Sequence, residues 1–516
     1  MAETSAAGVQ AAMTPEHWWE TDIVVALVVL ATAVPLLYPA IPPLVDLPGH
    51  MGRYRVELDL AQSPWLQQYF SYHWAAIGNL GVDLLVMALG PVIGLEPAVK
   101  LIVLAIPTMT AAGFLWVARE VHQRIPPTAY FAIPFIYGHP FLFGFVNFAL
   151  SMALAFLAFG LWLRLGRLGR IRLRAALFVP ISIIVFFAHT YGWGALGLLC
   201  FSAEAVRQHD RGVGWLKAGI NAAGHASVMA LPILITILWR SEAHGGSTGD
   251  WFNWDGKLLW VKTALRDRWQ TFDIASVAVI GLVYFEALRN RRLTFSRNLA
   301  FSGLILAAAF VTLPRIIFGS AYADMRLVPY AIAVLVLAIR FRGEATRKLG
   351  TVLAVLALAY ATVRLGSNTV SLAAAANDQQ VKLQALAQIP EGARVVSFFQ
   401  LPCGISWALP RNSHLGSMVI VRRHGFSNDQ WLMEGLNLLE LKYRAPGYFT
   451  SDPSNIVRPN ACPDRLHLPI DRALAALPRD AFDYVWLINV QGFDPKLVAG
   501  MQPVWRNGGS ILYRLH

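Results

Sequence analysis

Charged residues are scarce in this chain: Asp, Glu, Lys and Arg make up 14% of its 516 residues, whereas hydrophobic residues make up 56%. About a quarter of an ordinary soluble domain is charged, so this composition excludes that class. Lys and Arg are absent from residues 1–22, and the uncharged run 23–44 that follows is long enough to cross a hydrocarbon core of about 30 Å. We therefore expect a multi-pass membrane protein whose first apolar run is a span and not a cleaved signal peptide.

Cysteine and familiar catalytic motifs are also sparse. The three cysteines exclude a Cys-rich metal site; Cys200 lies in an apolar run, whereas Cys403 and Cys462 share the polar C-terminal region, where a periplasmic location would let them pair. Neither a GxxxxGK[ST] phosphate loop nor an HExxH zinc motif is present, so ATP-driven transport and zinc proteolysis lack support. The net charge of +12 does not indicate a nucleic-acid partner, because the arginines form short clusters between apolar runs.

These basic clusters orient the chain in a membrane. The positive-inside rule places them on the cytoplasmic side, so the polar breaks between them face outward. We predict a polytopic α-helical protein of the inner (cytoplasmic) membrane with about eleven transmembrane helices. The clusters lie at 163–174, 206–217, 289–298 and 340–348.

The same argument divides the chain into parts. Residues 1–22 are expected to form an interfacial segment, and residues 23–366 a transmembrane domain. Its first outer loop covers 45–97 and contains a re-entrant or surface helix at 81–92. Residues 367–516 change in composition and predict a periplasmic α/β domain. The strand-like runs of that domain lie at 393–399, 417–423, 484–490 and 510–515.

Three polar residues follow the first apolar run at helical spacing. Asp46, His50 and Arg53 stand at i, i+4 and i+7, so a helix that begins near Pro48 places them on one stripe. At a membrane surface the Asp suits a catalytic base, a metal ligand or an ion-pair partner of Arg53, and the His suits a phosphate contact. The structural alternative is a turn and helix cap, which Asp before Pro or Gly often forms.

A second polar group lies on the outward side, where positive charge is usually sparse. Arg315 and Arg326 stand there beside Tyr322 and Asp324. The planar guanidinium binds phosphate through two parallel hydrogen bonds, so we expect one of the two arginines to hold a phosphate; snorkelling to the lipid headgroups is the structural alternative. Polar residues at helix breaks open to the same side as Asp46 and predict a shared substrate cavity: His139, Asn147, His189 and Tyr191.

Four stretches resemble the GT-C superfamily of membrane glycosyltransferases. The resemblance covers residues 20–366. Within the superfamily, the stretches look most like a group of bacterial multi-pass proteins whose substrates are undefined. It implies many spans and a C-terminal domain outside the cytoplasm. The stretches are DLPGHMGRYRV (46–56), GFVNFALSMALAFLAFGLWLRL (144–165), FFAHTYGWGALGLL (186–199) and ADMRLVPYAIAVLVLA (323–338).

The resemblance also implies a reaction. GT-C enzymes transfer a sugar from a polyprenyl-phosphate-linked donor to an acceptor on the outer side of the membrane by an inverting displacement. An acidic residue of the first loop acts as base or binds a divalent cation such as Mg or Mn, and Asp46 occupies that position; Val45 and Leu47 stand where the superfamily commonly has a second acid. The implied partners are the lipid-linked donor, membrane lipids, and a cell-envelope glycan, lipid or protein as acceptor.

A non-catalytic role is the competing hypothesis. The chain would then be a transporter or flippase for lipid-linked glycans, or an assembly subunit that keeps the same scaffold. A transporter is expected to line both halves of the membrane with polar residues near discontinuous helices. In this sequence the polar candidates gather on the outer side, which favours an enzyme that works at one face.

Overall fold

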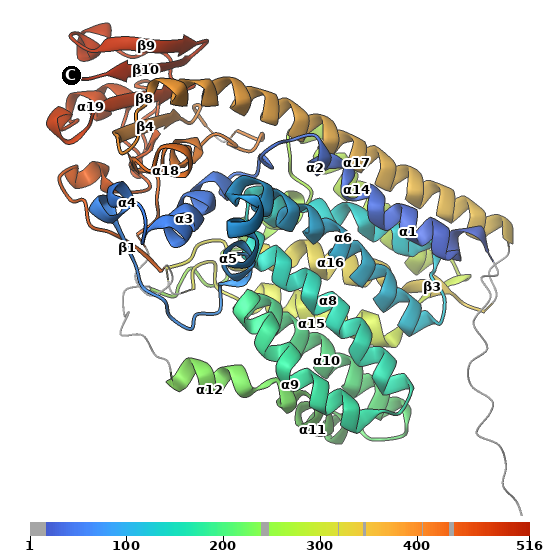
Figure 1. Ribbon diagram of the computed structural model, residues 1–516. Helices are drawn as coiled ribbons and strands as arrows, with labels where there is room; N and C mark the ends of the chain where they lie inside the picture. Colours follow the sequence, from blue (N-terminus) through green and yellow to red (C-terminus); the bar gives the residue numbers. More distant parts are fainter. Residues whose placement is uncertain (1–16, 239–246, 318, 344–346, 405, 433–437) are drawn as a thin grey trace, which may run out of the picture.

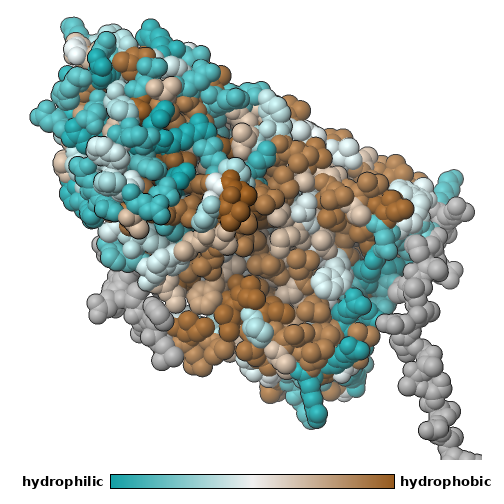
Figure 2. Space-filling view, viewed as in Figure 1, coloured by the Kyte–Doolittle hydropathy of each residue, from teal (hydrophilic) through white to brown (hydrophobic). Residues whose placement is uncertain are grey.

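The computed structural model describes residues 17–238, 247–317, 319–343, 347–404, 406–432 and 438–516. A bundle of apolar helices is joined at one end to a smaller domain built on a sheet (Figure 1). Figure 2 shows a hydrophobic surface over the bundle, with the polar C-terminal domain on one side and polar residues at the opposite end. This pattern agrees with a multi-pass membrane protein.

The predicted number of about eleven spans is not confirmed. Among the described residues, five helices are long and apolar enough to cross a membrane, or six if the bent pair Trp215–Met229 and Leu231–Ile237 forms one span. Four further apolar helices are shorter. The long helices are α6 (Leu95–His122), α8 (Val146–Arg167), α9 (Ile171–Ala188), α14 (Gln270–Arg289) and α17 (Arg347–Leu383). Others in the bundle are α10 (Thr190–Asp210), α15 (Arg297–Thr312) and α16 (Val328–Leu337).

Prolines account for two departures from the predicted spans. The run 23–44 becomes α1 (Asp22–Ala31) and α2 (Val34–Leu37), and the chain after it contains three prolines, which cannot donate a helical hydrogen bond. The apolar stretch after α6 forms a buried 3-10 helix, η2 (Pro127–Tyr137), with prolines at its start and in its interior. Of the predicted interfacial segment 1–22, residues 1–16 lie outside the described part, and Trp19 is buried in η1 (Trp18–Glu20).

Small residues bring the central helices together. A Cβ at Gly160 of α8 would lie 2.8 Å from Trp116 Cδ2, and one at Gly113 of α6 would lie 2.8 Å from Phe156 Cβ. Both glycines therefore allow backbones to approach more closely than larger residues would permit, as is common between membrane helices.

The C-terminal domain has a mixed sheet, with both parallel and antiparallel strand pairs. Its strands run in the order β5-β4-β8-β10-β9, with β7 also paired to β4, and β4 is parallel to β5, β7 and β8. Cys403 and Cys462 form a disulfide bond beside it. The strands are β4 (Arg394–Gln400), β5 (Phe426–Ser427), β7 (Ile456–Val457), β8 (Tyr484–Ile488), β9 (Gln502–Asn507) and β10 (Ser510–Arg514).

One predicted strand of this domain is a helix. The run 417–423 forms α18 (Met418–Arg423), whose Ile420 packs in one hydrophobic cluster while Val419 and Val421 pack in another. A short apolar run that is buried on both sides has no period that distinguishes strand from helix. The prediction was therefore wrong at this segment.

The first outer loop and the C-terminal domain form one structural unit. The loop contains α3 (Leu47–Asp59), α4 (Pro64–Tyr69), β1 (Phe70–Tyr72) and α5 (Gly81–Ile93). Strand β1 pairs antiparallel with β6 (Leu439–Leu441) of the C-terminal domain. Helix α17 passes without a break through the predicted boundary at 366–367, so the division into domains stays a prediction.

Candidate active site

Asp46 lies at the start of α3, on a loop held by the bundle. Its backbone N–H donates to the carbonyl of Phe143 at 2.9 Å, and Val45 N–H donates to that of Leu142 at 3.3 Å. The residue is 9% exposed and occupies the N-cap position, but its carboxylate makes no capping hydrogen bond. The sequence alone would suggest a helix cap at this position, but the Asp46 carboxylate does not cap the helix and is available to contact another group.

Gly144 fixes the position of this loop from the opposite side. It has a φ of +104°, which favours glycine, and a Cβ there would lie 2.7 Å from Asp46 N. We expect Gly144→Ala to displace Asp46 and to cost roughly 1–3 kcal/mol of folding free energy. Thermal unfolding of the purified variant would measure the loss. Gly169→Ala is the control, because Gly169 also has positive φ, at +70°, but a Cβ there meets nothing within 4 Å; equal losses in both variants would contradict the role of the Asp46 contact.

The C-terminal domain covers Asp46. His414 Nε2 lies 3.8 Å from Asp46 Oδ1, and His414 Nδ1 lies 3.3 Å from the backbone carbonyl of Asp429. Burial lowers the pKa of His414 to about 4, so the imidazole is neutral at pH 7. With Nδ1–H donating to Asp429, Nε2 presents a lone pair to the Asp46 carboxyl.

Two more carboxyls of the C-terminal domain lie in this region. Asp429 accepts hydrogen bonds from Ser417 and from Ser427, while Asp452 is joined to α3 through Gln430, whose side chain donates to Gly49 O at 3.0 Å. Burial raises the pKa of Asp429 to about 6, and burial with the Asp429 charge raises that of Asp452 to about 7.

The pKa of Asp46 is shifted in the same direction. Burial raises it well above its usual range, the charge of Asp452 raises it further, and the charge of Arg326 opposes both. A buried carboxyl whose pKa is raised in this way is a stronger base, once it is ionised, than an ordinary aspartate. This is the electrostatic setting of many catalytic carboxyls.

Arg326 is enclosed by aromatic rings. Its guanidinium carbon lies 4.5 Å from the Phe145 ring centroid and 5.1 Å from that of Tyr191. Nη2 donates to Ser320 Oγ at 3.2 Å, whereas the buried Nε has no hydrogen-bond partner within the described ranges. The cation therefore keeps an N–H for a ligand, and Tyr191, whose hydroxyl is also unsatisfied, lies beside it.

The neighbouring predicted residues have partners of their own. Asp324 is buried against Lys257 Nζ at 3.2 Å and caps its helix. Arg315 Nη1 lies 3.6 Å from Asp250 Oδ2, and its guanidinium carbon lies 5.7 Å from the Trp260 ring centroid and 5.5 Å from that of Tyr322. Arg315 and Arg326 are thus placed in different surroundings, and only Arg326 is among the charges acting on Asp46.

Two predicted ligand residues position a helix. Arg53 forms a buried ion pair with Asp83 at 2.7 Å, and Asn147 Nδ2 donates to the same carboxylate at 3.0 Å. Asn147 Oδ1 also accepts from Val82 N–H at 2.6 Å. Sequence reasoning did not select Asp83; an acid inside the apolar run 81–93 was the available signal.

The three predicted histidines differ. His50 packs against Trp431, with ring centroids 5.1 Å apart, and burial lowers its pKa. His189 Nδ1 accepts from Tyr191 N–H at 3.1 Å and caps α10. Both ring nitrogens of His139 are buried and without hydrogen-bond partners in the described structure, so this residue is a candidate ligand contact.

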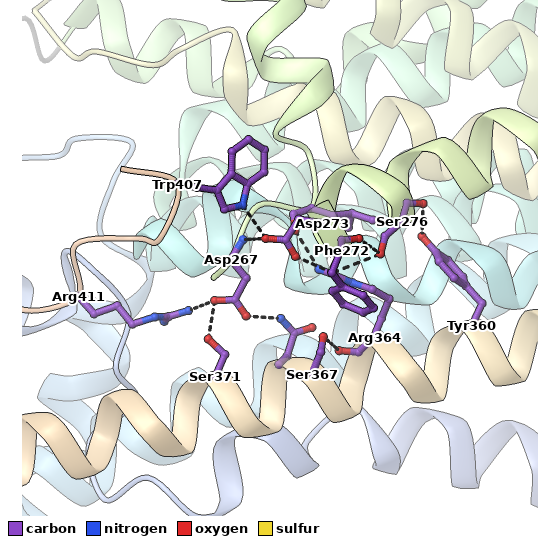
Figure 3. A network of polar contacts seen from close by, with 12 residues as sticks. Asp267, Phe272, Asp273, Ser276, Tyr360, Arg364, Ser367, Ser371, Trp407 and Arg411 are labelled. Atoms are coloured by element: carbon purple, nitrogen blue, oxygen red, sulfur yellow. Dashed lines mark hydrogen bonds and ion pairs between the residues drawn. The ribbon is translucent and has the colours of Figure 1, made fainter. Parts of the chain in front are cut away.

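A buried polar network anchors the C-terminal domain to the bundle (Figure 3). Asp267 accepts from Arg411 at 2.5 Å, and Arg411 also donates to the carbonyl of Pro43, three residues before Asp46. Asp273 accepts from Arg364 of α17 at 2.8 Å and from Trp407 Nε1 at 2.7 Å. The network therefore ties both the domain and the Asp46 loop to α17.

The described residues do not fit a metal site. No group of three His, Cys, Asp or Glu side chains among them is placed to hold one ion. A stable protein site for Mg or Mn needs several oxygen ligands, and the second acid of the superfamily pattern is absent beside Asp46. We therefore derive no step through a metal ion.

Comparison with known proteins shows a likeness in structure but none in sequence. No family model matches the sequence, and no curated protein matches it. The crystal structure of ArnT from Cupriavidus metallidurans bound to undecaprenyl phosphate is similar at 10% identity and a TM-score of 0.47, over 96% of this chain and 97% of that one. At that level the likeness concerns the course of the chain and carries nothing about activity.

Proposed function

We propose that this chain transfers a sugar from a polyprenyl-phosphate-linked donor to a cell-envelope acceptor, with inversion, and that Asp46 is the base. One observation carries this proposal: a buried carboxyl with no capping bond lies within reach of the charge of the aromatic-lined Arg326, whose Nε–H is unpaired in the described structure, where an apolar bundle meets a polar domain. An inverting transfer needs this pair of groups, one to take a proton and one to stabilise a leaving anion.

In the proposed step, Asp46 takes up the proton and Arg326 stabilises the leaving group. Asp46 accepts the proton of an acceptor hydroxyl as the oxygen forms a bond to the anomeric carbon of the donor. The bond between that carbon and the phosphate oxygen breaks, and its electron pair leaves with polyprenyl phosphate. The positive charge of Arg326 opposes the negative charge that develops on the phosphate. His414 Nε2 lies 3.8 Å from Asp46 Oδ1, and its lowered pKa keeps the imidazole neutral, so the proton taken from the acceptor stays on Asp46.

The proposed location is the bacterial inner membrane, with the C-terminal domain in the periplasm. The Cys403–Cys462 disulfide is typical of an oxidising compartment. Basic clusters lie at the other ends of the helices, as they do on the cytoplasmic side. A donor could then keep its prenyl chain in the bilayer while its phosphate lies at the surface near Arg326.

The direct test incubates the purified full chain in lipid nanodiscs with a panel of polyprenyl-phosphate hexoses and pentoses and an envelope extract. Release of polyprenyl phosphate together with a glycosylated product, both followed by mass spectrometry, is the expected result. Movement of intact donor between leaflets with no release would instead support the flippase alternative. Absence of both activities across the panel would favour an assembly subunit.

The pH profile carries a separate prediction. A base must be ionised, so kcat/KM should fall on acidification through the raised pKa of Asp46, well above the 3.8 of an ordinary aspartate. Asp452→Asn removes a charge that raises this pKa, so the acidic limb should move to lower pH. Initial rates from pH 4 to 9 measure the acidic limb of the parent protein and of the Asp452→Asn variant. An unchanged limb in Asp452→Asn would argue that another group titrates.

A further inference from the structure

A cavity lies at the end of the bundle away from the C-terminal domain, near β3 (Ile339–Phe341) in Figure 1. Its volume is about 470 Å³, and residues of α6, α8, α10 and the start of α15 line it. Nothing in the proposed sugar transfer uses this end of the molecule. It is the end that the basic clusters place in the cytoplasm.

Positive charge dominates the cavity wall. Six arginines line it against three carboxylates, so a net positive charge faces the space even if every carboxylate is ionised. The arginines are Arg167, Arg174, Arg207, Arg211, Arg297 and Arg340, and the acids are Glu120, Glu204 and Asp210.

Arg174 is held rigidly in that wall. It is 1% exposed, its guanidinium carbon lies 3.8 Å from the Trp162 ring centroid, and Nη1 donates to Glu204 Oε2 at 3.0 Å. Its Nη2 is buried without a hydrogen-bond partner in the described residues, and Nη1 of Arg207 is in the same state. Both guanidinium groups also donate to Glu204, so each has one nitrogen left over. Buried donors are normally satisfied, and these two nitrogens therefore point to a missing acceptor.

The N-terminus of α15 faces the same space. Ser296 at the N-cap lines the cavity, and its side chain makes no capping hydrogen bond. The first amide N–H groups of this 16-residue helix therefore remain available, and the positive end of the helix dipole adds to the arginines. A phosphate is the ligand that combines such a helix end with guanidinium groups.

We propose that this cavity binds a phosphate group on the cytoplasmic side, carried by an anionic lipid headgroup or by a soluble phosphate. The inference is independent of the sugar-transfer proposal. Basic pockets between membrane helices on this side commonly take anionic headgroups.

The test titrates the detergent-solubilised full chain with short-chain phosphatidylglycerol and, separately, with inorganic phosphate, and follows complex formation by native mass spectrometry. We expect Arg340→Gln and Arg207→Gln each to weaken binding roughly fivefold. Arg291→Gln removes the same charge from an exposed position that does not line the cavity, and it should leave the affinity unchanged. Arg340 is exposed, so its variant is expected to fold even if the Arg207 variant does not.

The outcomes distinguish a lipid headgroup from a soluble phosphate, or they show that the cavity binds neither. Binding of phosphatidylglycerol alone assigns the cavity to a lipid headgroup. Competition by inorganic phosphate at similar concentration assigns it to a soluble phosphate. If neither ligand binds, or if Arg291→Gln weakens binding as much as Arg340→Gln, the proposal is overturned.

Discussion

Asp46→Asn should lower kcat/KM for sugar transfer by about 10²–10⁴-fold, because the amide cannot accept the acceptor proton. The two side chains have nearly the same shape, and burial already favours the uncharged form of Asp46. The variant should therefore express and unfold like the parent. Initial rates of polyprenyl phosphate release, measured above the acidic limb, give the ratio.

The control for this variant makes the same chemical change elsewhere. Asp255→Asn alters an exposed carboxylate in the first turn of α13 (Trp254–Lys262), away from the Asp46 loop, and should keep nearly full activity. Near-normal turnover by Asp46→Asn would end its assignment as base and leave Asp46 with a structural role. A loss in both variants would indicate a general charge effect.

Asp273→Ala is expected to have the largest effect on stability, about 3–5 kcal/mol, because it leaves Arg364 buried without its carboxylate. Arg364 and Asp273 are each 1% exposed and 2.8 Å apart. The same carboxylate accepts from Trp407, so the loss should also loosen the C-terminal domain. Denaturant or thermal unfolding in one detergent, with limited proteolysis, measures both effects.

A double variant separates the ion pair from general damage to the core. Asp273→Leu with Arg364→Met removes both charges, and replacing a buried pair by apolar residues of similar size is often nearly neutral. We therefore expect this variant to recover much of the stability lost in Asp273→Ala. Asp273 also accepts from Trp407 Nε1 and from the backbone N–H of Asp267, at 2.9 Å for the latter. A double variant no more stable than the single one would show that these hydrogen bonds, and not the charges, are decisive.

The sequence predicted the class of protein well because that class depends on composition and on patterns along one segment. Apolar runs gave a membrane bundle, and the C-terminal change in composition gave a domain with a sheet. Asp46 was selected from its place after the first run. Span lengths were harder to predict, since prolines divide 23–44 and turn 127–137 into a 3-10 helix.

The surroundings of Asp46 could not be read from spacing. His414 lies beside it and Asp452 acts on it by charge, and both belong to a part of the chain more than 360 residues away, as the 368-residue separation of Arg411 from Pro43 illustrates. Helix and strand periodicity relate only residues that are close in sequence, so they cannot connect these residues to the first loop. The same limit hid the partner of Arg53 and Asn147, because Asp83 lies on a helix that packs against both.

The pairing of β1 with β6 also bears on how the chain is made. Ser71 and Glu440 lie opposite each other in this ladder and are 369 residues apart. At about 5–20 residues per second, the ribosome needs roughly 20–70 s to supply the partner strand after the first loop has emerged. During that interval β1 has an unpaired edge. A nascent chain arrested before residue 439 would therefore expose it, and the first loop should become resistant to protease only late in synthesis.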